Sequence, residues 1–188
     1  MRGFWQVTVL FYLAVVMARG EAAAAFRWDA PEVKVSIFSN QLGLMAPERE
    51  DYATNLAILA SNHVAEMKAT PTAIAAARRM IGLALQLSPR NKRAVVTNFQ
   101  LKKGIVPERV DGNYTRQSFA KLALTRGQLL EKQAGAENQT LARYFTQLAA
   151  ELDPTNEDAV YASEVQRLDQ GPPDWAAITD PKEKFIKP

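Results

Sequence analysis

The chain contains no cysteine and a single histidine among its 188 residues. The lack of cysteine excludes a disulfide, a thiolate nucleophile, a cysteine-ligated metal and a lipidated N-terminal cysteine. One histidine, His63, cannot supply the several imidazoles that a histidine-rich zinc site needs within one chain. We therefore expect His63 to be a structural or exposed residue, not a catalytic base.

The sequence also lacks a glycine-rich loop after a strand and a recognisable set of catalytic acids and bases. The carboxylate pairs Glu50-Asp51 and Glu157-Asp158 come at expected helix starts, where negative charge complements the helix dipole. Asp111-Gly112-Asn113 lacks the other ligands of a calcium loop and is better explained as a tight turn. We predict a protein that is not an enzyme and has no cofactor or metal; a hydrolase acting on envelope polymers is the enzymatic alternative.

No apolar run reaches the ~20 residues that a membrane-spanning helix needs. Arg2 is followed by an apolar run at 7–17, interrupted by one threonine, and by four alanines at 22–25. A positive start, a short apolar run and a small-residue cleavage region are typical of a secretory signal peptide. We expect residues 1–25 to be this signal and the secreted or periplasmic protein to begin near Phe26, with an uncleaved membrane anchor as the alternative.

The most informative feature that is present is an internal repeat. Residues 83–95, LALQLSPRNKRAV, recur 65 residues later as residues 148–160, LAAELDPTNEDAV, with seven of thirteen positions identical. Such a repeat indicates a chain built from stacked units. Small and apolar residues keep helical spacing before each proline: Ala77, Ile81, Ala84 and Leu85 in the first copy, and Ala142, Phe145, Ala149 and Leu152 in the second.

Each copy predicts the end of one helix, a tight corner and the start of the next helix. Pro89 and Pro154 cannot continue the preceding helix, because proline lacks the backbone N–H group and clashes with the turn before it. Ser88 and Asp153 precede these prolines, and we expect their side chains to cap the following helix.

This corner resembles the Leu-x-Pro-x-Asn-x-x-Ala corner of tetratricopeptide repeats. The matching residues are Leu87, Pro89, Asn91 and Ala94 in the first copy, and Leu152, Pro154, Asn156 and Ala159 in the second. The resemblance is to a divergent array and covers about residues 47–169. It implies an all-α fold in which antiparallel helix pairs form a solenoid, and a groove that binds a protein or peptide segment.

The expected organisation has four parts. Residues 26–46 form an extended arm, in which Val33, Val35 and Ile37 alternate as in a short strand or an extended segment. About six helices follow within 47–169, separated mainly by short corners that favour antiparallel neighbours. Residues 170–188 are expected to be a polar, flexible tail.

The charge is uneven along the chain. Residues 61–110 hold nine lysines and arginines against two glutamates, a net charge of +7, whereas residues 111–188 have a net charge of −3. A basic segment attracts acidic partners, although solvated helix faces produce the same pattern. In tetratricopeptide relatives, asparagine and lysine on groove-facing helices hold peptide carboxylates. By that resemblance we predict partner-binding residues at Arg93, Asn98 and Lys102.

These observations predict an exported, non-enzymatic interaction or scaffold module whose partner is a protein or peptide of acidic character. Nucleic acid is not an expected partner, because export separates the protein from it. The alternative is a membrane-anchored structural or accessory subunit of an envelope complex, which would contact the membrane through an uncleaved N-terminal helix. The mature N-terminus distinguishes the two.

Overall fold

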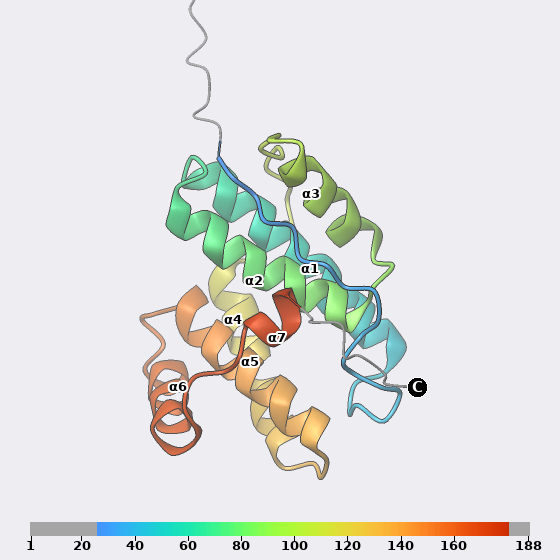
Figure 1. Ribbon diagram of the computed structural model, residues 1–188. Helices are drawn as coiled ribbons and strands as arrows, with labels where there is room; N and C mark the ends of the chain where they lie inside the picture. Colours follow the sequence, from blue (N-terminus) through green and yellow to red (C-terminus); the bar gives the residue numbers. More distant parts are fainter. Residues whose placement is uncertain (1–25, 181–188) are drawn as a thin grey trace, which may run out of the picture.

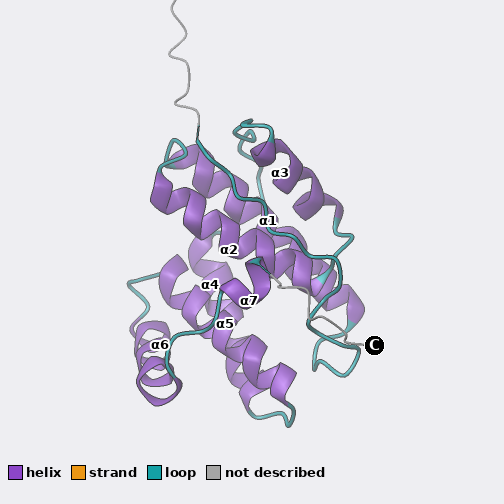
Figure 2. Ribbon diagram, in the orientation of Figure 1, coloured by secondary structure: helices purple, strands orange, loops and turns teal. Residues whose placement is uncertain are grey.

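A computed structural model describes residues 26–180; the expected signal peptide lies outside the described residues, as do residues 181–188. All regular secondary structure in the described part is helical, with no strand, which confirms the all-α fold class (Figures 1 and 2). None of its helices is long and apolar enough to span a bilayer. The helices are α1 (Ala46–Glu66), α2 (Pro71–Leu87), α3 (Lys92–Lys102), α4 (Arg116–Glu131), α5 (Ala136–Leu152), α6 (Glu157–Gln170) and α7 (Ala176–Thr179).

Two pairs of long helices form the body of the molecule. Helix α1 packs along α2, and α4 packs along α5, while α3 lies mainly against α1 and α6 mainly against α5. The eight small and apolar residues that keep helical spacing before Pro89 and Pro154, four in α2 and four in α5, are all buried. Small residues allow the close approach within a pair: a Cβ atom on Gly127 of α4 would lie 3.2 Å from the carbonyl oxygen of Ala142 in α5.

Aromatic side chains join the two pairs into one core. The ring of Tyr52 in α1 lies 6.0 Å from that of Phe119 in α4 and 4.9 Å from that of Phe145 in α5, measured between centroids. Neither phenylalanine has exposed surface. Because a fully buried aromatic side chain contributes about 1.5–3 kcal/mol to stability, this cluster holds α1 against the second helix pair.

The repeated corner has the same local structure in both copies. Oδ1 of Asn91 accepts a hydrogen bond of 2.9 Å from the N–H of Ala94, and Oδ1 of Asn156 accepts one of 3.2 Å from the N–H of Ala159. Both asparagines are therefore helix N-caps. Both alanines are completely buried. The recurring Asn-x-x-Ala pattern thus encodes a cap and a point of close helix contact.

The expectation that Ser88 and Asp153 cap the following helices was wrong. Each is the C-cap of the helix before the corner. The chain makes a turn that includes Pro89 or Pro154 before the next helix begins, so the cap position falls three residues later, at the asparagine. Oδ1 of Asp153 accepts a hydrogen bond of 2.6 Å from the hydroxyl of Thr155 and so stabilises the turn instead.

Residues 26–45 form an arm without strand structure that crosses the first helix pair (blue in Figure 1). The strand alternative for residues 33–37 is not the observed one: Val35 is 78% exposed, and the N–H of Ile37 donates a hydrogen bond of 2.8 Å to Oε1 of Gln86 in α2. Other apolar residues of the arm are buried instead: Trp28, Phe38, Leu42 and Leu44.

Residues 171–180, which follow α6, pack against the helices and so differ from the expected flexible tail. Helix α7 packs against α2, and Ile178 in α7 is completely buried. Nε1 of Trp175 donates a hydrogen bond of 3.0 Å to Gln147, and the hydroxyl of Tyr144 donates one of 2.7 Å to the carbonyl oxygen of Asp174. The sequence shows Trp175 as an isolated aromatic residue, but its ring lies 4.9 Å from that of Tyr144 in α5, measured between centroids, so the surface that it covers belongs to a distant helix.

Candidate partner-binding surface

Helix α3 presents one row of side chains to solvent. The row consists of Lys92, Val96, Phe99 and Lys103, which are all exposed; we call it the α3 stripe. Spacings of four, three and four residues keep these side chains on one side of a helix. On the opposite side of α3 only three residues are buried: Ala94, Thr97 and Leu101.

The α3 stripe combines apolar surface with positive charge. Phe99 is 59% exposed, and Val95 and Val96 beside it are also exposed. Nζ of Lys103 lies 5.7 Å from the centroid of the Phe99 ring, within the range of a cation–π contact. Aromatic residues such as Phe99 are enriched in protein interfaces, whereas lysine is depleted in them relative to the rest of the surface.

Arg93, one of the three predicted partner-binding residues, lies beside the α3 stripe. It lines an open groove of about 420 Å³ between α3 and α1, together with Lys92, Val96, Glu50, Thr54 and Asn91. Within residues 26–180, neither Lys92 nor Arg93 forms an ion pair. Both cations are therefore available to an acidic partner.

The acidic residue of this groove is already engaged inside the fold. Oε1 of Glu50 accepts a hydrogen bond of 2.7 Å from Nδ2 of Asn91, and Oε2 accepts one of 2.6 Å from the hydroxyl of Ser88. Nδ2 of Asn91 also lies 2.8 Å from the hydroxyl oxygen of Thr54. This network ties the start of α3 to α1 and sets the direction in which Lys92 and Arg93 project.

The other two predicted residues, Asn98 and Lys102, lie one turn apart on a side of α3 that Arg93 does not share. Asn98 faces the arm: its Oδ1 accepts a hydrogen bond of 2.8 Å from Nε1 of Trp28, and its Nδ2 donates one of 3.4 Å to the carbonyl oxygen of Pro31. Lys102 is exposed in the last turn. The structure therefore does not bring Arg93, Asn98 and Lys102 together. The four-three-four spacing of the α3 stripe was the signal that could have identified the surface.

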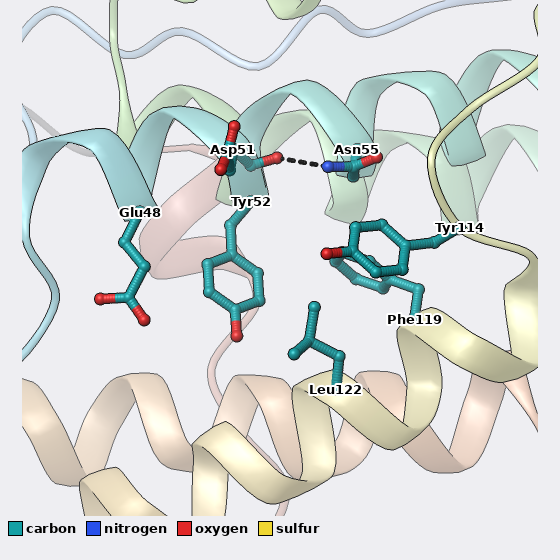
Figure 3. Close-up of a pocket in the computed structure, with 7 residues that line it drawn as sticks. All are labelled: Glu48, Asp51, Tyr52, Asn55, Tyr114, Phe119 and Leu122. Carbon is teal, nitrogen blue, oxygen red and sulfur yellow. Dashed lines mark hydrogen bonds between the residues drawn. The ribbon is translucent and has the colours of Figure 1, made fainter.

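A small aromatic pocket lies between α1 and α4 (Figure 3). Its volume is about 130 Å³, and its lining residues are Glu48, Asp51, Tyr52, Asn55, Tyr114, Phe119 and Leu122. Tyr52 is 5% exposed, and burial raises its pKa to about 12, an effect that Arg126 partly opposes. Nη2 of Arg126 lies 2.8 Å from Oε2 of Glu48, so that carboxylate is already paired. The pocket is smaller than the roughly 300–1,000 Å³ of a typical ligand site.

His63 lies half-buried in α1. Burial lowers its pKa below the ordinary value, with a further lowering from Arg116, and its Nδ1 atom makes no hydrogen bond. In the part of the chain that the structure describes, no three His, Asp or Glu side chains gather as a metal site would require.

Comparison with known proteins revealed no relative: no family model, curated protein or solved structure matches the chain. The resemblance to tetratricopeptide repeats therefore rests on the residues of the two corners. Function has to be inferred from the surfaces that the fold builds.

Proposed function

We propose that this protein is an exported, non-enzymatic interaction module that binds an acidic, partly apolar segment of a partner protein on the α3 stripe. The observation that carries the proposal is the exposure of Val96 and Phe99 between two cations, Lys92 and Lys103. Single exposed apolar residues are ordinary on protein surfaces, whereas α3 exposes three within five positions.

The apolar and charged parts of the stripe would have different tasks. Removing Val96 and Phe99 from water supplies affinity, because burial of apolar surface is the main favourable term in association. Lys92, Lys103 and the neighbouring Arg93 attract negative charge from a distance and raise the rate of encounter. Binding should therefore weaken with salt, since the Debye length falls to about 8 Å at physiological ionic strength.

The position of the arm favours the outer side of α3 as the binding surface, because the arm occupies the side that carries Asn98. Asn98, which the family resemblance implied as a peptide ligand, already bonds Trp28 and Pro31 of the arm. In the divergent tetratricopeptide-like array that we propose, with α1–α3 and α4–α6 as its two units, the arm covers one side of the first unit. The α3 stripe remains open to solvent.

Export is the second part of the proposal and rests on the signal-like composition of residues 1–25. The secreted or periplasmic protein would begin near Phe26. If the segment is retained, the same surface would belong to a membrane-anchored accessory subunit of an envelope complex. Intact-mass analysis of the native protein tests this part: a mass that includes Met1, in a membrane fraction, would favour the anchored form.

Partner capture tests the surface. The purified protein, immobilised, is exposed to a native envelope extract in parallel with the variant Lys92→Ala/Phe99→Ala, and captured proteins are identified by mass spectrometry. The affinity of an identified partner is then measured by calorimetry at two salt concentrations. We expect the variant to lose at least tenfold in affinity, and the parent to bind more weakly at the higher salt concentration.

The matched control changes one cation and one exposed apolar residue of α4, Lys121→Ala/Leu129→Ser. Melting temperatures of both variants should stay close to that of the parent, because exposed side chains contribute little to folding. Equal affinity of parent and α3 variant would refute the proposed surface, as would equal losses in the α3 and control variants.

A further inference from the structure

Helix α6, which follows the second copy of the corner, presents a row of exposed side chains of its own. The row is Glu157, Tyr161, Glu164 and Leu168, which we call the α6 stripe; Tyr161 and Leu168 are each 73% exposed. Helix α6 buries only Ala159 completely. A helix that buries so little of its surface leaves most of it available for contact with another molecule.

The two stripes occupy equivalent positions in the repeat. Each residue of the α6 stripe comes 65 positions after one of the α3 stripe: Glu157 after Lys92, Tyr161 after Val96, Glu164 after Phe99 and Leu168 after Lys103. The shared four-three-four spacing averages about 3.7 residues, close to the 3.6-residue turn of an α-helix, so each row stays on one face of its helix. Each stripe therefore has the shape of a helix-packing seam without a partner helix.

The stripes differ in the sign of their charge. Helix α3 carries three cations and no anion, whereas α6 carries four anions and one cation. The contrast is sharpest at the two helix starts, where Lys92-Arg93 in α3 corresponds to Glu157-Asp158 in α6. Opposite charge around exposed apolar residues makes the two surfaces complementary, and like-charged surfaces would repel each other.

The fold prevents the two stripes from meeting within one molecule. Helix α3 lies against the first helix pair and α6 against the second, on opposite sides of the molecule (Figure 1). Complementary surfaces on opposite sides of one chain can meet only between separate copies.

Resting on the proposed function, we propose that the acidic, partly apolar segment held by the α3 stripe is the α6 stripe of a second copy of this chain. The contact is heterologous, because different surfaces of the two copies meet. Each association leaves one α3 stripe and one α6 stripe free, so copies add head to tail until a ring closes or a filament extends. The protein would thus continue its own helical array beyond one chain.

Two variants with one defective surface each provide the test. The first, Lys92→Glu/Phe99→Ser, disables the α3 stripe, and the second, Glu157→Lys/Tyr161→Ser, disables the α6 stripe. Sedimentation velocity over a range of concentrations measures the size of each protein alone and of an equimolar mixture. The control Lys121→Glu/Leu129→Ser changes a surface of α4, and circular dichroism melts verify that every variant is folded.

We expect the parent to form species larger than a monomer as concentration rises, and to dissociate with added salt. Each defective variant alone should remain a monomer. Their mixture should form a one-to-one dimer and nothing larger, because only one functional pair of stripes is present. If a double variant does not fold, the single changes Phe99→Ser and Tyr161→Ser replace it and should each reduce association at least tenfold.

Three results would overturn the proposal: a parent that stays monomeric at all concentrations, defective variants that associate like the parent, or a mixture that does not dimerise. Capture from the envelope extract distinguishes a failure of the self-association proposal from a failure of the proposed function. A monomeric parent that still captures a different protein through Lys92 and Phe99 rejects the second copy as the partner and keeps the α3 surface. A monomeric parent that captures nothing refutes both.

Discussion

Nε1 of Trp28 donates a hydrogen bond of 2.8 Å to Oδ1 of Asn98, and so connects the arm to α3 across 70 positions of the chain. Trp28 is 9% exposed, so its N–H group has little access to water. This contact explains why Asn98, which looks like a ligand residue in the sequence, has its partners inside the molecule.

The variant Asn98→Ala should destabilise the fold by about 1–3 kcal/mol, because it leaves a buried N–H donor without a partner. Urea unfolding followed by circular dichroism measures the loss. Trp28→Phe removes the donor itself. The double variant Trp28→Phe/Asn98→Ala should lose less stability than the sum of the two single losses. Strictly additive losses would show that the two side chains do not interact.

The two N-cap asparagines should differ in their contribution to stability. Asn156→Ala removes a cap and should cost about 1 kcal/mol. Asn91→Ala removes a cap and also the hydrogen bonds from Nδ2 to Glu50 and Thr54. We expect a loss of about 2–4 kcal/mol at Asn91, because a buried, charge-assisted hydrogen bond is lost with the cap. Chemical denaturation of both variants checks the order, and equal losses would contradict it.

The repeated small residues should tolerate no enlargement. Ala84 and Ala149 have no exposed surface, so Ala84→Leu and Ala149→Leu should each destabilise by about 1–3 kcal/mol through overpacking. Thermal melts measure the effect. Ala136→Leu, at an exposed position in the first turn of α5, is the control and should melt like the parent. The expected packing would be refuted if both buried variants melted like this control.

Stability should fall at high pH because of two buried tyrosines. Burial raises the pKa of both Tyr52 and Tyr144 from 10.0 to about 12. Between these values the unfolded chain loses protons that the folded protein keeps, so stability is full below pH 10 and decreases up to about pH 12. Each tyrosine lowers the free energy of unfolding by up to about 1.4 kcal/mol per pH unit in this window.

Urea unfolding at a series of alkaline pH values measures this decrease. Tyr52→Phe and Tyr144→Phe should each make the curve shallower between pH 10 and 12, and the double variant should be the shallowest. The comparison isolates the tyrosines, because lysines titrate equally in all variants. Parallel curves for the parent and the double variant would show that the folded pKa values are not raised.

Part of the candidate surface could be predicted from sequence. The charge count identified the segment that contains α3, and Arg93 does lie beside the α3 stripe. The prediction of Asn98 relied on residue type, which carries no information about the direction in which a side chain points. Phe99 was recognisable as apolar, but its exposure depends on which helix α3 lies against, and α3 lies mainly against α1.

The sequence by itself determined the all-helical class, the inward faces of α2 and α5 and the position of both corners. These features act over a few residues: proline removes an N–H group, asparagine caps the next helix, and apolar residues repeat with the helical period. Only the tertiary structure decided that Tyr52 joins the two helix pairs, that α7 packs on α2 and that α3 and α6 lie on opposite sides. Those relationships connect residues dozens of positions apart, so they depend on how whole helices pack and not on any local pattern.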